Sequence, residues 1–420
     1  MSTEVRSATE SASERYTAGP LSGLRVLELG GWAAGPVVGK HLANQGAEVI
    51  RIESRRRLDG FRTNYPPFKD NVPGPDRAAI FNYFNDGKRS ISLNLKHPRA
   101  LELARRLVAG SDVVVENFTP GTMARLGLGY AELSADNPGL VMLSTCNQGQ
   151  RGPHAHHAGF GTHLTALSGF TQLLGYPDRT PALLYGPYID FIAVGYGTIA
   201  VLAALRRRKR TGRGCWIDLS QYETGLQVMA PALLDLFANG RVATRAGNRD
   251  AVAVPHGVFP CRGQEQWVGL SVADDDEWAR FVAALEAPDW TSDPAFATVH
   301  DRRANEDRLE ALIAAWTAER HRNDVVERLL RQHVPVYPVN SMADLYADPQ
   351  LAHRGTWRPV EHPVLGKVHV AAPPFRLSAT PPPEARPAPL LGADNRFVLG
   401  EILGLGAEQI AELDQAGALE

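Results

Sequence analysis

The sequence predicts an α/β protein whose larger part is a Rossmann-like parallel sheet, accompanied by a smaller α+β domain. Apolar strand-like segments alternate with helix-like segments through about the first 150 residues, which is typical of a doubly wound fold. The chain has 420 residues, enough for two or three domains of about 150 residues each. From about residue 222 the alternation gives way to helices around a short β-like stretch, which indicates a separate α+β domain.

The β-α-β pattern is clearest near the N-terminus. Residues 24–29 (LRVLEL) are continuously apolar and predict a buried strand. The turn GGWAAGP follows, and Pro36 suits the first turn of a helix over about residues 36–45. Residues 47–53 (AEVIRIE) predict the next strand, so we expect a right-handed crossover between parallel strands. The same reasoning predicts strands at 90–95, 112–116, 140–144 and 215–219, and helices at 98–110 and 191–210.

The later part of the chain has a different pattern. Residues 350–390 are predicted to be extended, with Pro381, Pro382 and Pro383 as a stiff connector. The other elements predicted there are a helix after residue 222, a β-like stretch at 256–272, and helices at 276–285, 306–319, 394–404 and 407–418.

The charge balance and the cysteine count exclude several classes of protein. There are 44 Lys and Arg against 46 Asp and Glu residues, so binding to nucleic acid or to an anionic membrane is not expected. Cys146, Cys215 and Cys261 are far apart and form no C-x-x-C pair, which argues against a disulfide scaffold and a structural zinc site. A reducing, cytoplasmic location is the expectation.

Two segments bear on targeting. Residues 1–19 are small and polar without an apolar core, and we expect a disordered tail over residues 1–20. Residues 191–205 form the most apolar stretch, but 15 residues are fewer than the roughly 18–20 needed to span a bilayer. A buried helix is therefore predicted there.

The glycine-rich turn at residues 30–35 is the first candidate binding feature. It lies where a nucleotide phosphate could meet a helix N-terminus, and Glu53 follows at the distance of a ribose-binding acid. The G-x-G-x-x-G spacing is missing and Trp32 is bulky, so a tight turn without a nucleotide is the alternative. Three consecutive arginines beginning at Arg55 suit a phosphorylated ribose, or they form a solvated charge run.

Five sequence blocks in order are more specific than any single motif. They are LSGLRVLELGGWAAGP, FNDGKRSISLNLK, VVENFTPGTMARLGL, LAALRRRKRTGRGCWIDLSQYE and APLLGADNRFVLGEILGL. With these blocks the chain resembles the class III CoA-transferase family, also called the CaiB/BaiF family. The resemblance implies a large coenzyme A-binding domain built from residues 21–221 and 345–420, a small domain of residues 222–344, and an interlocked homodimer. A heteromer with a related subunit is the other arrangement.

The resemblance also implies where coenzyme A binds. The phosphates of this substrate favour Arg, Lys and loop amides, and its adenine favours an apolar or aromatic wall. Acyl-CoA and a carboxylic acid are the implied substrates, without a metal or redox cofactor. The residues implied to line the coenzyme A site are Ala33, Ala34, Arg55, Leu93, Asn94, Leu95, Lys96, Asn117, Phe118, Thr119 and Arg125.

Asp190 is the candidate catalytic residue. It is a lone acid in the segment YGPYIDF, just before the long apolar helix. From the residues alone, an acid in this place is most simply a helix N-cap. The resemblance implies instead that its carboxylate is the nucleophile of a double displacement, through a mixed anhydride and an aspartyl-CoA thioester. Backbone amides would then stabilise the oxyanion.

The sequence departs from the family pattern in several places. No run of glycines occurs in residues 247–250 or 255–261, where many members carry a glycine-rich loop. Ala33 stands where some members use glutamine, and Cys215, expected to be buried and inert, also replaces the more usual glutamine. Ala33, the missing glycine-rich loop and Gly161, which departs from a motif of related enzymes, keep open a non-catalytic, coenzyme A-binding subunit of a heteromeric transferase, although Asp190 argues against it.

Histidines raise two more functional possibilities. The α-methylacyl-CoA racemases resemble this family and use a base histidine, whose position is occupied here by Phe160. His163 could replace that base only in a rearranged pocket. His154, His156 and His157 suggest a metal site, but three loop histidines without carboxylate or cysteine support seldom form one.

Overall fold

The structure is a computed structural model that describes residues 19–420. The predicted tail, residues 1–20, lies almost wholly outside the described residues. The sequence pattern places residues 169–183 in the large domain, but in the structure they belong to the second of two compact units. The first unit comprises the residues up to Ser168, Leu184–Pro231 and Gln350–Glu420, and the second comprises Gly169–Leu183 and Ala232–Pro349.

A six-stranded parallel sheet forms the centre of the first unit, with the strand order β3-β2-β1-β4-β5-β6. The strands alternate with helices along the chain, which confirms the predicted Rossmann-like fold. Because β1 pairs with β2 on one side and with β4 on the other, the strand order reverses between β1 and β4. The strands are β1 (Arg25–Leu29), β2 (Glu48–Glu53), β3 (Arg89–Ser92), β4 (Val113–Glu116), β5 (Val141–Cys146) and β6 (Cys215–Ser220).

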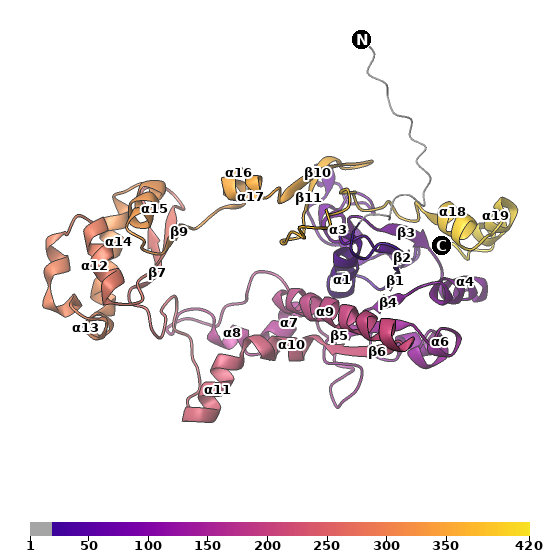
Figure 1. The fold of residues 1–420 in the computed structure, drawn as a ribbon, viewed down its shortest axis with the longest axis horizontal. Coiled ribbons are helices and arrows are strands. Elements are labelled where there is room, and N and C mark those ends of the chain that lie inside the picture. The colour runs from indigo at the N-terminus through magenta and orange to yellow at the C-terminus, as the bar shows by residue number, and fades with distance from the viewer. Residues whose placement is uncertain (1–18) are drawn as a thin grey trace, which may run out of the picture. The chain divides into compact units, whose positions relative to one another are not determined.

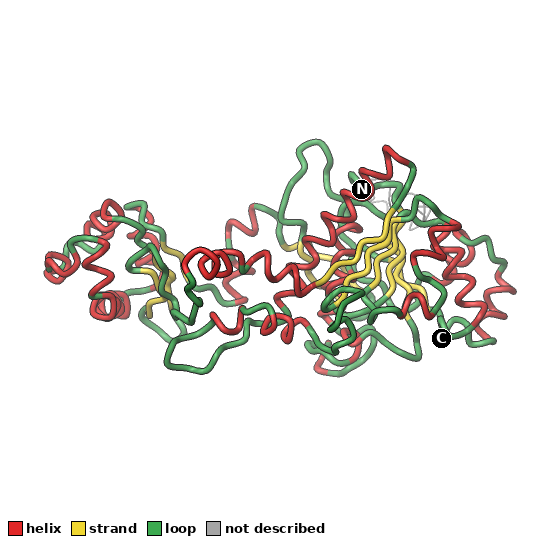
Figure 2. The backbone as a smooth tube through the Cα atoms, turned by 90° about the horizontal axis from the view of Figure 1, so that it is seen from below, coloured by secondary structure: helices red, strands yellow, loops and turns green. Residues whose placement is uncertain are grey.

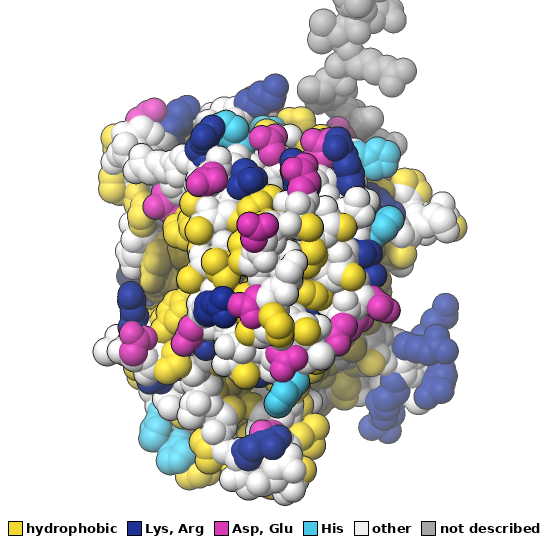
Figure 3. Space-filling model, turned by 90° about the vertical axis from the view of Figure 1, so that its left-hand side faces the viewer, with side chains coloured by type: hydrophobic (Ala, Val, Ile, Leu, Met, Phe, Trp, Pro, Cys, Tyr) yellow, Lys and Arg dark blue, Asp and Glu magenta, His cyan; other side chains and the backbone are white. Residues whose placement is uncertain are grey.

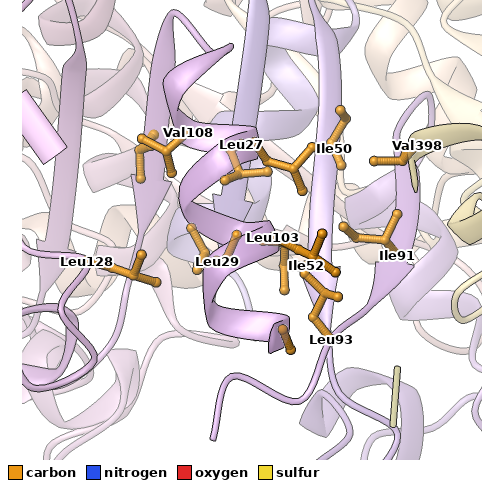
Figure 4. Packing of buried hydrophobic residues seen from close by; sticks show 14 of the residues in the cluster. Leu27, Leu29, Ile50, Ile52, Ile91, Leu93, Leu103, Val108, Leu128 and Val398 are labelled. Atoms are coloured by element: carbon orange, nitrogen blue, oxygen red, sulfur yellow. The ribbon is translucent and has the colours of Figure 1, made fainter. Parts of the chain in front are cut away.

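Helices cover both faces of this sheet (Figure 1, Figure 2). On one face, Leu103 and Val108 of α4 pack with Leu27 and Ile50 of the strands and with Val398, as Figure 4 shows. On the other face α1, α3 and α9 form a second apolar layer. The strands are apolar on both faces for this reason. The helices of this unit are α1 (Ala34–Ala43), α2 (Gly60–Thr63), η2 (Lys69–Asn71), α3 (Ala79–Asn85), α4 (Pro98–Ala109), α5 (Thr122–Arg125), α6 (Tyr130–Asp136), α7 (Gly161–Leu167), α9 (Tyr188–Thr211), α10 (Gln221–Val228), α17 (Pro349–His353), α18 (Asn395–Phe397), the π-helix η5 (Val398–Ile402) and α19 (Ala407–Gln415).

The proline-rich segment is more ordered than its sequence predicts. Within residues 350–390, β10 (Trp357–His362) and β11 (Gly366–Ala371) pair as an antiparallel hairpin. Local composition indicates an extended backbone here, but only the facing strand supplies the hydrogen bonds of a sheet. The two strands are extended as predicted, but their pairing was not predicted, and residues 350–353 belong to α17 instead. Pro381, Pro382 and Pro383, the predicted connector, lie outside the hairpin and outside any helix or strand.

Helix α9 begins at Tyr188, three residues before the predicted start at 191. By length and composition it is the one helix in the described chain that could cross a membrane. It packs against α1, β5 and β6 instead, and a Cβ on Gly197 would lie only 3.2 Å from Leu143 and Val38. We therefore interpret α9 as a core helix of the sheet.

The second unit has its own antiparallel sheet of three strands in the order β7-β8-β9. Its helices enclose a separate apolar core that includes Phe281, Phe296 and Ile313. Acidic and basic side chains are interspersed on the face of this unit nearest the viewer in Figure 3, in keeping with the balanced charge of the chain. The elements lying wholly or mostly in this unit are α8 (Phe170–Leu173), α11 (Ala230–Asn239), β7 (His256–Pro260), β8 (Trp267–Ser271), α12 (Asp275–Ala284), η3 (Asp289–Ser292), η4 (Pro294–Phe296), α13 (Val299–Ala304), α14 (Glu306–Ala318), α15 (Arg322–Arg331), β9 (Val336–Pro338) and α16 (Met342–Ala347).

Candidate active site

The turn after β1 lies at the point where the strand order reverses, and α/β proteins bind ligands at such switch points. Asn117, the residue after β4, fixes this turn through two hydrogen bonds. Its Oδ1 accepts from the Gly31 N–H at 3.1 Å, and its Nδ2 donates to the Gly31 carbonyl at 2.7 Å. Gly30 has a φ of 124°, and a Cβ there would overlap Asn117 Oδ1. The close approach of Asn117 therefore requires glycine at this position.

Ala33 and Ala34 lie at the start of α1, directly after this turn. Both are buried, and no side chain caps the helix start at Ala33. The first N–H groups of a helix have no partner within the helix, so such a start favours an anion. Trp32, just before it, has a φ of 62° and its N–H donates to the Asp59 carboxylate at 3.2 Å. The structure thus brings Asn117 to the turn that leads into Ala33 and Ala34.

A buried ion network supports the turn, and sequence reasoning missed it. Arg51 of β2 donates to the Gly30 carbonyl at 3.1 Å and forms ion pairs with Glu28 and Asp59. Lys88 Nζ lies 2.8 Å from Glu28; burial lowers the pKa of Lys88 to about 8, against the opposing effect of Glu28. The members come from separate elements, so no local spacing signals them. The only signal of this network in the sequence is that charged residues such as Glu28 and Arg51 occur within apolar strands.

Glu53 is not free to bind a ribose. Its carboxylate is buried, lies 2.7 Å from Arg62 Nε and accepts a hydrogen bond from Ser90 Oγ at 2.6 Å. Burial alone would raise its pKa, but Arg51 and Arg62 outweigh burial and lower the pKa of Glu53 to about 2. The Glu53 carboxylate is therefore not available to bind a ribose, although its spacing from the glycine turn suggested that role.

Residues 93–96 follow β3, two strands away from β1 in the sheet order. Leu93 is buried, and Leu95 packs against the same apolar core. The Asn94 N–H donates to the Ala418 carbonyl at 2.9 Å, which ties this segment to the C-terminal end of the chain. Lys96 is exposed. Within this implied coenzyme A segment Lys96 is therefore the exposed member, whereas Asn94 and Leu95 are both half-buried.

The residues after β4 present a more accessible edge. Phe118 is half-buried, whereas Thr119 and Arg125 are exposed. Arg125 Nη2 donates to Thr122 Oγ1 at 2.8 Å, which orients its guanidinium along this loop. Arg55, after β2, is exposed as well. These exposed cations lie beyond the carboxyl ends of their strands, the edge at which α/β proteins bind phosphates.

Asp190 lies within the first turn of α9, so it is not the N-cap that its sequence position suggested; that residue is Pro187. Its carboxylate sits against the start of α7, where a Cβ on Gly161 would lie 2.6 Å from Asp190 Oδ1. Burial is what raises the pKa of Asp190 to about 7, and no charged neighbour in the described chain offsets it. Such a carboxyl group changes its charge near neutral pH and is a candidate nucleophile.

An aromatic cluster connects the glycine turn with the start of α7. The Trp32 ring lies 5.4 Å from Phe61, 5.7 Å from Tyr65 and 5.7 Å from Phe160, each at an edge-to-face angle. Phe160 immediately precedes Gly161, and its side chain is 59% exposed. An apolar wall therefore runs from the switch point to the neighbourhood of Asp190. Sequence reasoning singled out Trp32 only as an obstacle.

His163 and Cys215 both have surroundings that indicate a structural role. His163 Nδ1 accepts a hydrogen bond from the Phe160 N–H at 3.1 Å, so this ring caps α7. Within residues 19–420, no group of three or more His, Cys, Asp and Glu side chains is arranged to hold a metal ion. Cys215 begins the edge strand β6 and is half-buried, not buried as expected, because an edge strand lacks a neighbour on one side.

The stretch that replaces the glycine-rich loop belongs to the second unit. Gly247 has a φ of 63°, and a Cβ on it would lie 2.7 Å from the Tyr176 ring. Asn248 Nδ2 donates to the Tyr176 hydroxyl at 3.1 Å. With Pro260 and Glu310, among other residues, Tyr176 and Asn248 line a cavity of about 680 Å³. A single glycine and a tyrosine ring thus shape this stretch.

Comparison with known proteins adds independent findings. A model of the family described as CoA-transferase family III matches residues 21–395. The succinyl-CoA–L-malate CoA-transferase alpha subunit of Chloroflexus aurantiacus is 35% identical over 398 residues, which is 94% of this chain and 91% of that relative. The succinate–glutarate CoA-transferase of Agrobacterium fabrum is 33% identical over 384 residues, 91% of this chain and 96% of that relative. The crystal structure of a CaiB/BaiF family protein from Brucella suis matches with a TM-score of 0.84 at 32% identity, over 92% of this chain and 100% of that one.

Proposed function

Because this chain belongs to CoA-transferase family III, and is therefore a CoA-transferase of class EC 2.8.3.-, we propose that Asp190 is the group that carries its transfer chemistry. The observation behind this proposal is the half-buried Asp190 carboxylate beside Gly161, without a charged partner in the described chain. A carboxylate that is not neutralised by a cation keeps its nucleophilicity. The family resemblance of the sequence and the surroundings of this carboxylate both support the proposal.

The chemistry follows from a carboxylate nucleophile. Asp190 attacks the thioester carbonyl of the donor acyl-CoA; a mixed anhydride forms and the coenzyme A thiolate leaves. The thiolate then attacks the Asp190 carbonyl, which gives an aspartyl-CoA thioester and releases the donor acid. The acceptor carboxylate displaces the thiolate in turn, and the thiolate attacks the acceptor carbonyl of the new anhydride. Acceptor acyl-CoA leaves, and the Asp190 carboxylate is restored.

We place coenzyme A along the carboxyl edge of the sheet. The uncapped start of α1 at Ala33 and Ala34 supports a phosphate position, and the exposed side chains of Arg55, Lys96 and Arg125 supply positive charge nearby in the same unit. The aromatic cluster from Trp32 to Phe160 offers an apolar surface toward Asp190. The further residues of this proposed site are Leu93, Asn94, Leu95, Asn117, Phe118 and Thr119.

The acyl-CoA donor, the partner subunit and the cellular location are also parts of this proposal. The relatives named above use succinyl groups by name, so succinyl-CoA is the donor to test first. A homodimer is supported by the apolar side chains that α9 leaves exposed, Phe191, Ile199 and Leu202. The relative named as an alpha subunit supports a heteromer as the alternative. A cytoplasmic location agrees with three free cysteines in the described chain.

Acyl trapping tests the proposal. The protein is incubated with succinyl-CoA or acetyl-CoA, quenched with hydroxylamine, digested, and searched by mass spectrometry. We expect a hydroxamate on Asp190 that is absent from Asp190→Ala. No adduct from a broad donor panel, despite measurable coenzyme A binding, would contradict the mechanism. Deuterium exchange at the α-carbon of a 2-methylacyl-CoA would then distinguish a racemase from a non-catalytic subunit.

A further inference from the structure

The segment after β4, residues 117–122, is held to the rest of the first unit at three points. Asn117 is hydrogen-bonded to both backbone groups of Gly31. The Phe118 N–H donates to Glu116 Oε2 at 2.8 Å, and the Gly121 N–H donates to Gln150 Oε1 at 3.4 Å. This segment includes three of the residues proposed to contact coenzyme A, so whatever fixes its backbone also fixes part of that site.

Glu116 is the most buried of these three anchors and is itself held from two other strands. Only 2% of its surface is exposed. The Ser144 side chain of β5, directly opposite in the sheet register, hydrogen-bonds to the Glu116 carboxylate. Trp216 of β6 donates from Nε1 to Ser144 Oγ at 2.9 Å. A continuous row of hydrogen bonds thus crosses β6, β5 and β4 and ends at the Phe118 N–H.

A second carboxylate on the same edge holds the neighbouring loop. Asp218 of β6 pairs with Ser144 in register, and its Oδ1 accepts from the Gln150 N–H at 2.9 Å. Gln150 is the residue whose side chain receives the Gly121 N–H, and its Nε2 lies 3.7 Å from Cys146 Sγ. Glu116 and Asp218 therefore anchor the segment from both of its ends.

We propose that Glu116 is a positioning residue for coenzyme A: its buried carboxylate holds the Phe118 N–H, and thereby keeps residues 117–122 in the conformation that binds this substrate. The proposal rests on the proposed function, since coenzyme A is the ligand in question. Glu116 acts through backbone position and touches no reacting atom. Its loss therefore weakens binding more than it slows the chemical steps.

The ionisation of Glu116 supplies a signature that a purely structural contact lacks. Burial raises the pKa of Glu116 to about 7, the Ser144 and Phe118 hydrogen bonds oppose this, and the Asp218 charge adds to it. Besides Asp218, the Cys146 thiol faces this edge; burial raises its pKa to about 11, so it stays neutral. The ionised carboxylate accepts the stronger, charge-assisted hydrogen bond. Substrate affinity should therefore rise between about pH 6 and pH 8.

The test compares binding and turnover in matched variants. Calorimetry with desulfo-CoA gives the dissociation constant, and acetyl-CoA turnover gives kcat, each at pH 6, 7 and 8. Glu116→Ala should weaken desulfo-CoA binding about tenfold, with kcat within about twofold of wild type. Glu116→Gln should bind like wild type at pH 6, about threefold more weakly at pH 8, and lack the wild-type gain in affinity. Ser111→Ala, a buried serine just before the opposite end of β4, should change neither quantity.

Three results would overturn the positioning role: unchanged affinity in Glu116→Ala, a loss confined to kcat, or wild-type pH dependence in Glu116→Gln. If Glu116→Ala fails to fold, Ser144→Ala is used to test the proposal instead. This variant keeps the Glu116 carboxylate and removes one hydrogen bond that lowers the pKa of Glu116. The pH midpoint of binding should then move upward, and an unmoved midpoint contradicts the proposal. Wild-type binding of desulfo-CoA without transfer would contradict the transferase mechanism alone; no wild-type binding would contradict both.

Discussion

Two carboxylates of the first unit, one fully buried and one half-buried, have opposite surroundings. Glu28, fully buried in β1, lies 2.6 Å from Arg51 Nη1 and 2.8 Å from Lys88 Nζ. Asp190 has no ion pair with a described residue, and burial raises its pKa to about 7. A buried charge that only supports the fold has to be neutralised. An acid left without a cation is costly for the fold, and that cost is a sign of chemical use.

A glycine beside each carboxylate makes the comparison testable. A Cβ on Gly39 of α1 would overlap Glu28 Oε2, and a Cβ on Gly161 of α7 would lie 2.6 Å from Asp190 Oδ1. In both cases a helical glycine, which has no side chain, leaves space for a neighbouring carboxylate. Gly39 of α1 leaves space for the structural acid Glu28, and Gly161 of α7 leaves space for the proposed nucleophile Asp190. Substitutions at these positions should affect different properties, stability in the first case and transfer in the second.

The largest effect should come from removing the unpaired acid. Asp190→Ala should lower the transfer rate by about 10⁴-fold, because no other group in the site can form the anhydride. The rate is measured by chromatography of the acyl-CoA product. Glu223→Gln, which changes an exposed acid in the first turn of α10, is the matched control and should retain full activity. Substantial activity in Asp190→Ala would assign the nucleophile elsewhere.

Removing the paired acid should damage the fold instead. Glu28→Gln leaves Arg51 and Lys88 buried without their shared anion, so the free energy of unfolding should fall by about 3–5 kcal/mol. Urea denaturation followed by circular dichroism measures this quantity. Glu223→Gln again serves as control, with an expected change within about 0.5 kcal/mol. A change below about 1 kcal/mol in Glu28→Gln would mean that the network contributes little.

Gly161→Ala tests whether the position of the Asp190 carboxylate controls the transfer rate. The added Cβ would overlap Pro187 Cβ and lie 2.6 Å from Asp190 Oδ1, so it should shift the start of α9 together with the Asp190 carboxylate. A displacement of about 1 Å can cost about 100-fold in rate. Gly195→Ala in α9 is the control, since a Cβ there meets nothing within 4 Å and should add about 1 kcal/mol of stability. Normal transfer by Gly161→Ala, measured with the same chromatographic assay, would contradict the tight placement of Asp190.

The pH profile of transfer tests the raised pKa directly. The ionised carboxylate is the nucleophile, so kcat/KM for the donor should rise about tenfold from pH 6 to pH 8, with an apparent pKa near 7. Measuring the profile in Glu116→Gln removes the contribution of Glu116, whose pKa is also raised to about 7. A flat profile between pH 5 and 8 would show that Asp190 ionises at an ordinary carboxyl pKa.

The smallest effect concerns the stability cost of Asp190. Its folded pKa lies above the unfolded value, so ionisation opposes folding and stability decreases as pH rises toward 7. Asp190→Asn should therefore raise the free energy of unfolding by about 1–2 kcal/mol at pH 8, a figure reduced because the residue is partly exposed. At pH 4 the variant should match wild type. Thermal unfolding at both pH values measures the difference, and equal stability at pH 8 would contradict it.

Sequence patterns predicted the parallel sheet because the patterns that indicate apolar strands and amphipathic helices involve residues close together in the sequence. They placed Asp190 before the helix as an N-cap, whereas it lies inside the first turn of α9; its role as nucleophile came from the family resemblance and stays a prediction. The β10–β11 hairpin was not predicted, because an extended segment acquires its pairing only from a strand that folds against it. Gly161 was noted as a departure from a motif, with no indication that it adjoins Asp190.

The sequence by itself determined the alternation of strands and helices in the parallel sheet, the glycine turn after β1 and the family resemblance from which Asp190 is proposed. Only the tertiary structure decided their surroundings: the pairing of Glu28 with Lys88, the contact of Asn117 with Gly31, and the isolation of Asp190. Helix and strand preferences depend on residues a few positions apart. Charge neutralisation and desolvation depend on groups that are distant in sequence and meet only after packing.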